Sequence, residues 1–228
     1  MKKKDWLVLS LMPGIGNSIL KSICSSSIEN IEDLKTNFLN GKYEIKRLRD
    51  KENFKKELDN LQFYEDLCFS IIEQCKEKGI AILSQDMTEY PETLKECNDS
   101  PFIIYVKHKG KNSLKSFQTW ENNITIVGSR DVPDDVSEWT YEAAKILSKK
   151  YYNVISGLAL GVDKSAHQGA LESRNGMTTA IIPNCDEIVP SSNTKLADSI
   201  LNADGVIISE NYPQKKFDPK QLVQRNRI

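Results

Sequence analysis

The 228-residue sequence lacks the features that define several classes of protein. Its five cysteines form no Cys-x-x-Cys pair, and only two histidines accompany them, so neither a metal site nor a disulfide framework is expected. No stretch approaches the ~20 apolar residues of a membrane span, and the apolar run 6–12 has no signal-peptide cleavage site behind it. A cytoplasmic location without a membrane partner is therefore expected.

An excess of positive charge is also missing. Lys and Arg number 31 against 32 Asp and Glu, which gives a formal net charge of −1. Global charge gives no support to nucleic-acid binding, so any such function must rest on a few local contacts. The hydrophobic fraction of 39% is that of an ordinary globular protein, with room for a small and a medium domain.

Residues 1–78 carry apolar side chains at helical spacing and predict a small all-helical domain. The clearest helix is expected over 54–78, where Gly79 ends it. The segment Pro13-Gly14-Ile15-Gly16 lies between two short helices. It is typical of a helix-hairpin-helix (SAM-like) unit, whose amides can contact a DNA phosphate, and a plain turn between helices explains it as well.

From Ile80 onward the pattern changes to short apolar strands, first at 80–83 and 102–106. A polar connector at 107–123 leads into four strand–helix units. The predicted strands are 124–127, 153–156, 178–182 and 206–209, and the predicted helices are 134–150, 163–174, 193–202 and 219–227. Strands that are apolar on both faces favour a buried parallel sheet. Residues 79–228 thus predict an α/β domain with a Rossmann-like, doubly wound parallel sheet. Its first helix is expected to bury Val136, Trp139, Ala143, Ile146 and Leu147.

Ligands of such sheets bind at the carboxyl ends of the strands. Two glycine-containing loops stand there. Gly128, Ser129 and Arg130 follow the first strand of the series, and Gly157 and Gly161 follow the second. These loops can offer amides, a hydroxyl and a guanidinium to a phosphate, or they can be tight turns that bring strand and helix together.

Neither loop matches a Walker A or Gly-x-Gly-x-x-Gly motif, so no ATP or NAD cofactor is expected. Asp163 is expected to cap the following helix. His167, one turn further along, suits either an acid–base or metal role or a hydrogen-bonded structural role, and no catalytic residue is assigned.

Two further segments supply polar groups. Asn193 can cap the next helix, and Lys195 in its first turn opposes the helix dipole, which indicates either a bound anion or a solvated lysine. Arg225, Asn226 and Arg227 end the most basic stretch of the chain, which is either a phosphate-binding segment or a solvated helix end.

Taken in order, these motifs make the sequence resemble the DNA-processing protein A (DprA/Smf) family. The matching residues are 13–16, Tyr90, Pro91, Leu94, Pro101, 126–130, 155–163, Ala166, His167, 169–171, Gly176, 178–181, Pro190, Asn193, Leu196, 205–210 and 225–228. Each motif alone is weak, but their order and spacing are specific.

The resemblance implies a single-strand DNA-binding protein that protects incoming DNA and helps load a RecA-type recombinase during transformation and recombination. It implies a homodimer and no catalytic turnover. It assigns phosphate contacts to Arg130 and Lys195 and the Arg-Asn-Arg motif to 225–227. Cys185 and Val189 depart from the family pattern, where glycine and tyrosine are usual. The family also continues beyond the position of Ile228, so a C-terminally truncated member is expected.

Two other functions fit the same sheet. One is an enzyme or sensor for small nucleotides, although the Pro-Gly-Gly-x-Gly-Thr loop of phosphoribohydrolases is absent from the sequence. The other is a protein-interaction module whose Rossmann-like site is vestigial.

Overall fold

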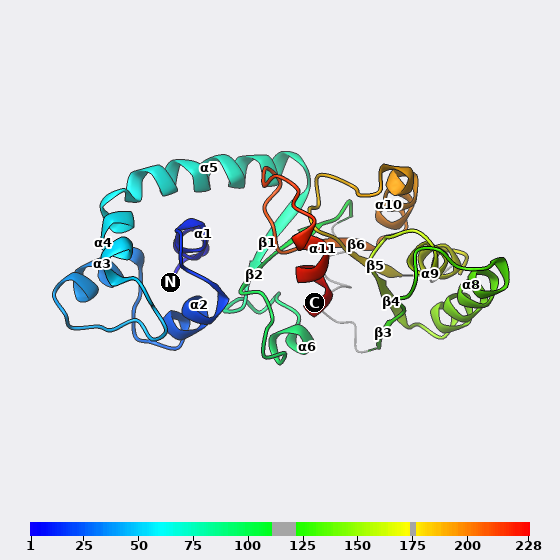
Figure 1. The fold of residues 1–228 in the computed structure, drawn as a ribbon, viewed down its shortest axis with the longest axis horizontal. Coiled ribbons are helices and arrows are strands. Elements are labelled where there is room, and N and C mark those ends of the chain that lie inside the picture. Colours follow the sequence, from blue (N-terminus) through cyan, green and yellow to red (C-terminus); the bar gives the residue numbers. More distant parts are fainter. Residues whose placement is uncertain (111–121, 174–176) are drawn as a thin grey trace. The chain divides into compact units, whose positions relative to one another are not determined.

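The structure, a computed structural model, describes residues 1–110, 122–173 and 177–228 (Figure 1). The chain forms two compact units, Met1–Gln74 with Leu83–Ile103, and Cys75–Ile82 with Ile104–Ile228. The units differ from the expected division at 78/79 because residues 83–103 pack with the N-terminal helices. Parts of the predicted connector 107–123 and of the predicted helix 163–174, together with Gly176, lie outside the described residues.

The first unit is built mainly from helices. They are α1 (Lys3–Leu11), α2 (Asn17–Cys24), α3 (Ile31–Leu39), α4 (Lys51–Asp59), most of α5 (Leu61–Glu77) and α6 (Glu92–Lys95). The assignment of these helices to the helix-hairpin-helix type stays a prediction. No helix in the described residues is both long and apolar enough to cross a membrane.

The single helix predicted over 54–78 is interrupted at Asn60. This residue is the C-cap of α4, with φ −96° and ψ 25°, and its carbonyl accepts the amide of Phe63 at 3.1 Å. Leu58 and Leu61 on either side of the break are both buried, so the apolar spacing continues through it and conceals it. The predicted end of the helix is confirmed, because Gly79 adopts the left-handed φ of +64°.

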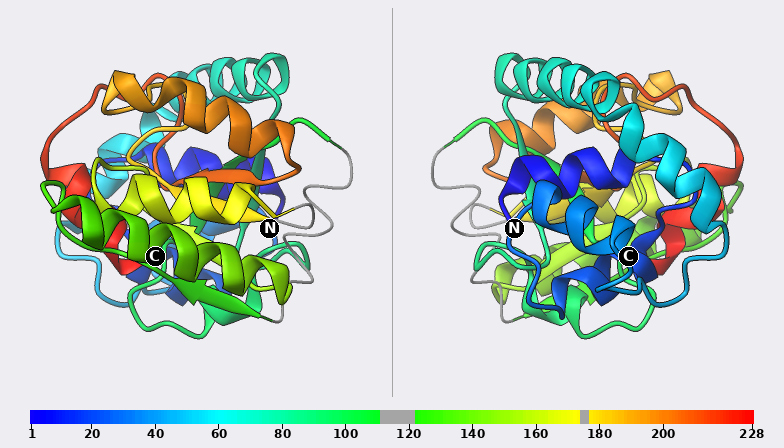
Figure 2. Two further views of the ribbon diagram at one scale, coloured as in Figure 1. Left: turned by 90° about the vertical axis from the view of Figure 1, so that its right-hand side faces the viewer. Right: turned by 90° about the vertical axis from the view of Figure 1, so that its left-hand side faces the viewer.

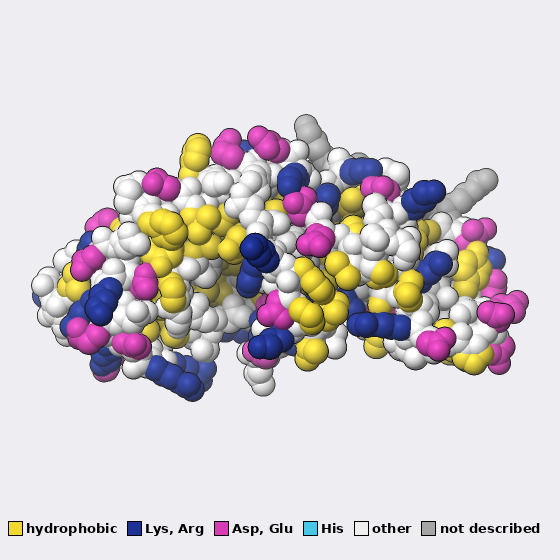
Figure 3. Space-filling view, turned by 45° about the horizontal axis from the view of Figure 1, so that its top comes forward, with side chains coloured by type: hydrophobic (Ala, Val, Ile, Leu, Met, Phe, Trp, Pro, Cys, Tyr) yellow, Lys and Arg dark blue, Asp and Glu magenta, His cyan; other side chains and the backbone are white. Residues whose placement is uncertain are grey.

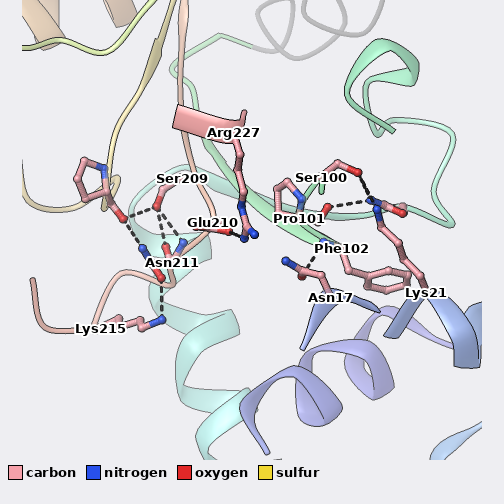
Figure 4. Close-up of polar contacts among 12 residues, drawn as sticks. Asn17, Lys21, Ser100, Pro101, Phe102, Ser209, Glu210, Asn211, Lys215 and Arg227 are labelled. Carbon is pink, nitrogen blue, oxygen red and sulfur yellow. Dashed lines mark hydrogen bonds and ion pairs between the residues drawn. The ribbon is translucent and has the colours of Figure 1, made fainter. Parts of the chain in front are cut away.

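Residues 83–103 are fastened to the helices of the first unit through Phe102. Its ring lies 4.8 Å from that of Trp6, and its amide donates to Asn17 Oδ1 at 2.9 Å (Figure 4). The indole Nε1 of Trp6 donates to Asp86 at 2.8 Å. Buried aromatic rings and satisfied polar groups thus join two segments that lie about a hundred positions apart in the sequence.

The second unit contains a six-stranded sheet in the order β1-β2-β6-β5-β4-β3. The strands are β1 (Ile80–Ser84), β2 (Ile103–Lys107), β3 (Asn123–Thr125), β4 (Asn153–Ser156), β5 (Thr178–Ile181) and β6 (Val206–Ser209). Strands β3, β4, β5 and β6 pair in parallel, with Ile124 opposite Val154 and Ala180 opposite Ile207, while β2 pairs antiparallel with β6. The predicted α/β class with a mostly parallel sheet is confirmed.

The parallel strands are joined by α8 (Asp134–Lys149), α9 (Val162–Leu171) and α10 (Thr194–Asn202), which cover one face of the sheet (Figure 2). A doubly wound sheet reverses its strand order and carries connecting helices on both faces. The four parallel strands instead follow one another in chain order. Right-handed crossovers that advance in one direction place their helices on one side, so the described strands are wound once.

The opposite face is bordered by the end of the chain. Thr125, Val127 and Ile155 alternate with the residues that face the helices, and they line a cavity together with residues of α11 (Lys220–Gln224) and η2 (Arg225–Arg227). The short helix η1 (Ser191–Asn193) leads into α10.

Helix α8 buries little of the face that its apolar residues predict, since Leu147 packs against the core whereas Val136 and Ile146 are exposed. Trp139 is 73% exposed, whereas Thr140, Ala144 and Ser148 are buried. Small residues on this face allow α8 to approach α9 closely, and Ser148 Oγ donates to the carbonyl of Ala170 at 3.0 Å. Close contact with α9 therefore determines which face of α8 is buried, although the opposite face of α8 is more apolar.

We expect Phe102→Ala to destabilise the first unit by roughly 3–5 kcal/mol, because it leaves a cavity beside Trp6. The measurement is urea unfolding followed by tryptophan fluorescence. Phe69→Ala, at a phenylalanine that is 66% exposed, is the matched control and should change stability by no more than about 0.5 kcal/mol. Equal losses in the two variants would contradict the structural role given to Phe102.

Candidate nucleic-acid-binding site

The predicted site residues gather at the carboxyl ends of β3, β4 and β5, as expected for this sheet. They line two separate pockets. A cavity of about 610 Å³ is lined by Gly128, Arg130, Gly157 and residues 225–227. A second pocket of about 550 Å³ is lined by Asn193 and Lys195. The structure thus brings most of the predicted residues together and sets two of them apart.

Arg225 points into the protein. Its guanidinium donates to the carbonyls of Gly157 and Ile181, the latter at 2.7 Å, and lies 3.9 Å from the Asp163 carboxylate. Burial lowers the pKa of Arg225 below its ordinary value, and Asp163 acts in the opposite direction. With a 9% exposed side chain, Arg225 joins the loop after β4 to the end of β5 and does not face solvent.

The glycines of the two loops have internal reasons for their identity. A side chain at Gly157 would overlap the Arg225 guanidinium, and a Cβ at Gly128 would lie 2.7 Å from a methyl group of Val162. Gly161 has φ +69°, and a side chain there would overlap the carbonyl of Ser129. The two loops are therefore packed directly against each other, and this explains the glycines without a ligand.

Arg130 and Ser129 lie on the outer side of this packing. Arg130 is exposed and has no ion pair among the described residues. Ser129 Oγ donates to the carbonyl of Asp131 at 2.9 Å, which shapes the turn, and Ser129 O accepts the amide of Val162 at 3.1 Å. Within the described chain, the amides of Ser129 and Arg130 donate to no protein acceptor. In this exposed loop a guanidinium and two adjacent amides thus have no partner among the described residues.

Asn193 and Lys195 also divide into a buried residue that holds the backbone and an exposed residue. Asn193 is buried, and its Nδ2 donates to the carbonyls of Leu158 and Ala159 at 2.9 and 3.1 Å. Asn193 fixes the start of α10 against the loop after β4. Lys195, in the first turn of α10, is exposed and forms no ion pair in the part of the chain that the structure describes.

The remaining predicted residues, Asn226 and Arg227, lie at the end of the chain, and Glu210 directly after β6 binds Arg227. Arg227 forms an ion pair with Glu210, and Ser209 Oγ donates to the carbonyl of Pro183 at 2.7 Å (Figure 4). Asn226 is exposed and lines the larger cavity. The Glu210–Arg227 pair was not predicted, because the two residues meet only after the chain end folds back over β6.

Asp163 was predicted as a helix N-cap, but Gly161 occupies that position. The Asp163 carboxylate instead accepts the amide of Ala159 at 3.4 Å and faces Arg225. The sequence offered one sign of this role: Asp163 stands in an apolar segment, and a buried carboxylate usually needs a cationic partner.

His167 is buried in the helix–sheet interface. Its Nδ1 lies 2.8 Å from Thr178 Oγ1, and that hydroxyl donates to the carbonyl of Val154 at 2.6 Å. The network therefore assigns the proton to Nδ1. Burial lowers the pKa of His167 to about 3, and the nearby Arg225 cation adds to the effect. This geometry is that of a neutral structural histidine.

Fold and site define a class: an α/β protein of Rossmann-like type with cations at the carboxyl edge of its parallel strands that have no ion pair in residues 1–110, 122–173 and 177–228. The sequence model of the family described as "DNA recombination-mediator protein A" matches residues 81–228. The chain therefore belongs to the DNA recombination-mediator protein A family.

Named relatives agree with this assignment. Protein Smf of Borreliella burgdorferi is 36% identical over 159 residues, which is 69% of this chain and 48% of that protein. The DNA processing protein DprA of Bacillus subtilis is 28% identical over 167 residues, which is 73% of this chain and 54% of that protein. The chain thus spans about half the length of these relatives.

Two solved structures are similar to this fold. DprA of Streptococcus pneumoniae superposes with a TM-score of 0.61 at 24% identity, over 93% of this chain and 74% of that one. DNA processing protein A of Helicobacter pylori, whose structure was described for its single-stranded DNA binding mode, superposes with a TM-score of 0.53 at 26% identity. That match covers 64% of this chain and 62% of the Helicobacter chain.

The packing of the two loops predicts that Gly161→Ala destabilises the second unit by roughly 2–4 kcal/mol, through a left-handed φ and a clash with Ser129. Gly41→Ala is a matched control, since Gly41 has φ +67° and nothing within 4 Å of the added Cβ. It should cost only the ~1–2 kcal/mol of the left-handed conformation. Thermal unfolding compares the two variants, and equal costs would show that the loops are not in close contact.

Because burial lowers the pKa of His167, we expect the protein to lose stability in mild acid. Its pKa is about 3 when folded and near 6.5 when unfolded, so between these values the unfolded chain binds the extra proton. The His167 contribution is thus complete above pH 6.5 and falls with pH, by about 2 kcal/mol from pH 7 to pH 5 at ~1.4 kcal/mol per pKa unit. Urea titrations should show that His167→Gln flattens this dependence and that His108→Gln does not. Parallel curves for wild type and His167→Gln would contradict the assignment.

Proposed function

We propose that this chain binds single-stranded DNA through phosphate contacts made by Arg130 and Lys195. One observation carries the proposal: these two predicted cations are exposed and without an ion pair among the described residues, whereas Arg225 is buried and Arg227 is paired with Glu210. Membership of a recombination-mediator family and likeness to the Helicobacter pylori protein support single-stranded DNA as the ligand.

The geometry supports two roles among the predicted residues: some would contact a phosphate and the others stabilise the loops. Arg130 can grip a phosphate with two parallel N–H groups, and the free amides of Ser129 and Arg130 add neutral donors beside it. Gly128, Gly157, Gly161, Asn193 and Arg225 keep the loops in shape. Because phosphate contacts carry no base information, binding should be nearly independent of sequence.

The charge distribution supports few contacts rather than a broad basic surface. On the face drawn in Figure 3, Lys and Arg side chains are interspersed with Asp and Glu, in keeping with the net charge of −1. Electrostatic steering toward DNA is then weak, and affinity depends on Arg130, Lys195 and their immediate surroundings.

The proposed role is binding without catalytic turnover, in preparation for a recombinase of the RecA type. The family description as a recombination mediator supports such a partner, and a homodimer is part of the same proposal. A cytoplasmic setting fits the five cysteines, which form no disulfide in the part of the chain that the structure describes. Measuring recombinase binding with and without DNA tests the first partner. Sedimentation of the chain alone tests whether it forms a homodimer.

A small-nucleotide enzyme or sensor remains the second candidate, because the cavity beside Arg130 is large enough for a mononucleotide. It is partly apolar, with Val127, Ile155 and Val223 in its wall. A rise in melting temperature with AMP but not with oligo-dT would favour this candidate over DNA binding.

We expect Arg130→Ala and Lys195→Ala each to weaken binding of labelled oligo-dT and to flatten the log–log dependence of affinity on salt by ~0.7, the value for one phosphate contact on a single strand. Fluorescence anisotropy at several salt concentrations measures both effects. Lys150→Ala removes an exposed lysine at the far end of α8 and should change neither. Unchanged affinity and slope in both site variants would refute the proposed site.

A further inference from the structure

The pocket that contains Lys195 holds a second lysine that sequence motifs did not single out. Lys164 in α9 and Lys195 in α10 line the same pocket of about 550 Å³, together with Gln168, Ser192 and Ser199. The pocket shares no lining residue with the cavity beside Arg130. Helices α9 and α10 lie side by side over the sheet (Figures 1 and 2), and the pocket lies between them.

The electrostatics of this pocket are unbalanced. Lys164 and Lys195 are both exposed, and within the described residues neither forms an ion pair. Each stands in the first turn of its helix, where a positive side chain is disfavoured. The acidic lining residue Glu172 forms no ion pair with either lysine in the part of the chain that the structure describes. Two cations and one carboxylate thus line the pocket, and no ion pair joins them among the described residues.

The backbone around the two lysines is fixed rather than loose. Asn193 precedes α10 and is tied to the carbonyls of Leu158 and Ala159, in the loop that leads into α9. The start of α9 is held in turn, since the amide of Val162 donates to Ser129 O at 3.1 Å. The same hydrogen bonds connect this pocket to the Arg130 loop. The backbone that carries Lys164 and Lys195 is therefore linked to the backbone that carries Arg130.

We propose that Lys164 is a further phosphate contact and that this pocket binds a phosphodiester of the same DNA strand that Arg130 contacts. The inference rests on the proposed function and extends it: the strand runs from the loop after β3, across the start of α9, to the start of α10. A phosphate between Lys164 and Lys195 gives both ammonium groups an anionic partner. The Ser192 hydroxyl and the Gln168 amide then supply neutral donors, whereas the Ser199 hydroxyl already donates to the Lys195 carbonyl.

The test is an anisotropy titration of oligo-dT of roughly 20 nucleotides, longer than one site of ~4–16 nucleotides, at several salt concentrations. Lys164→Ala should weaken binding several-fold and flatten the salt slope by ~0.7, while Lys164→Arg should keep the slope. Lys150→Ala is the matched control and should match wild type. Because Lys164 opposes the helix dipole, Lys164→Ala should not lower the melting temperature, so weaker binding cannot reflect unfolding.

The outcomes separate the two proposals. An unchanged slope in Lys164→Ala, with a flattened slope in Arg130→Ala, would overturn this inference and leave the proposed function standing. Unchanged slopes in both variants would overturn both. Inorganic phosphate forms the second arm at matched ionic strength. If it raises the melting temperature of wild type but not of Lys164→Ala, and oligo-dT affinity is equal in the two, the pocket binds a free anion and the DNA path is wrong.

Discussion

The buried contact of Arg225 with the loop after β4 is the interaction on which the arrangement of the site depends. One guanidinium binds the carbonyls of Gly157 and Ile181 and faces the carboxylate of Asp163. A cation with so little exposure is tolerated only when its donors are satisfied and a counter-charge is near. Both conditions are met by backbone and side-chain groups from the loop after β4, from β5 and from α9, so Arg225 anchors the last described residues to three segments at once.

This contact explains why the glycines and the exposed cations of the predicted site have different roles. Gly157 leaves room for the guanidinium, and Gly161 leaves room for the Ser129 carbonyl. The glycine-rich appearance of the loops therefore reflects close packing, while the capacity to bind an anion remains with the side chains that this packing turns outward. The proposed function assigns that capacity to Arg130 and Lys195, because neither forms an ion pair with an acidic side chain of the described residues.

Local patterns predicted the elements well. The strands at 153–156 and 206–209 were predicted at their observed bounds, since short apolar runs between turn residues admit few alternatives. Apolar periodicity gave wrong predictions where tertiary contacts determine which residues are buried or where a helix ends. The apolar stripe of α8 with Trp139 is exposed because small residues on the other face allow closer contact with α9. The break at Asn60 is invisible to periodicity because buried residues continue on both sides of it.

The sequence by itself determined the order of strands and helices, the α/β class and the family, because these depend on periodicity and on motifs read along the chain. Which motif residues face solvent was decided only by the tertiary structure. Arg130 and Arg225 have the same side chain, yet one is free and the other is buried against Gly157, a residue 68 positions away. The difference arises from the loops that meet in space, and a long-range contact of this kind leaves no local pattern in the sequence.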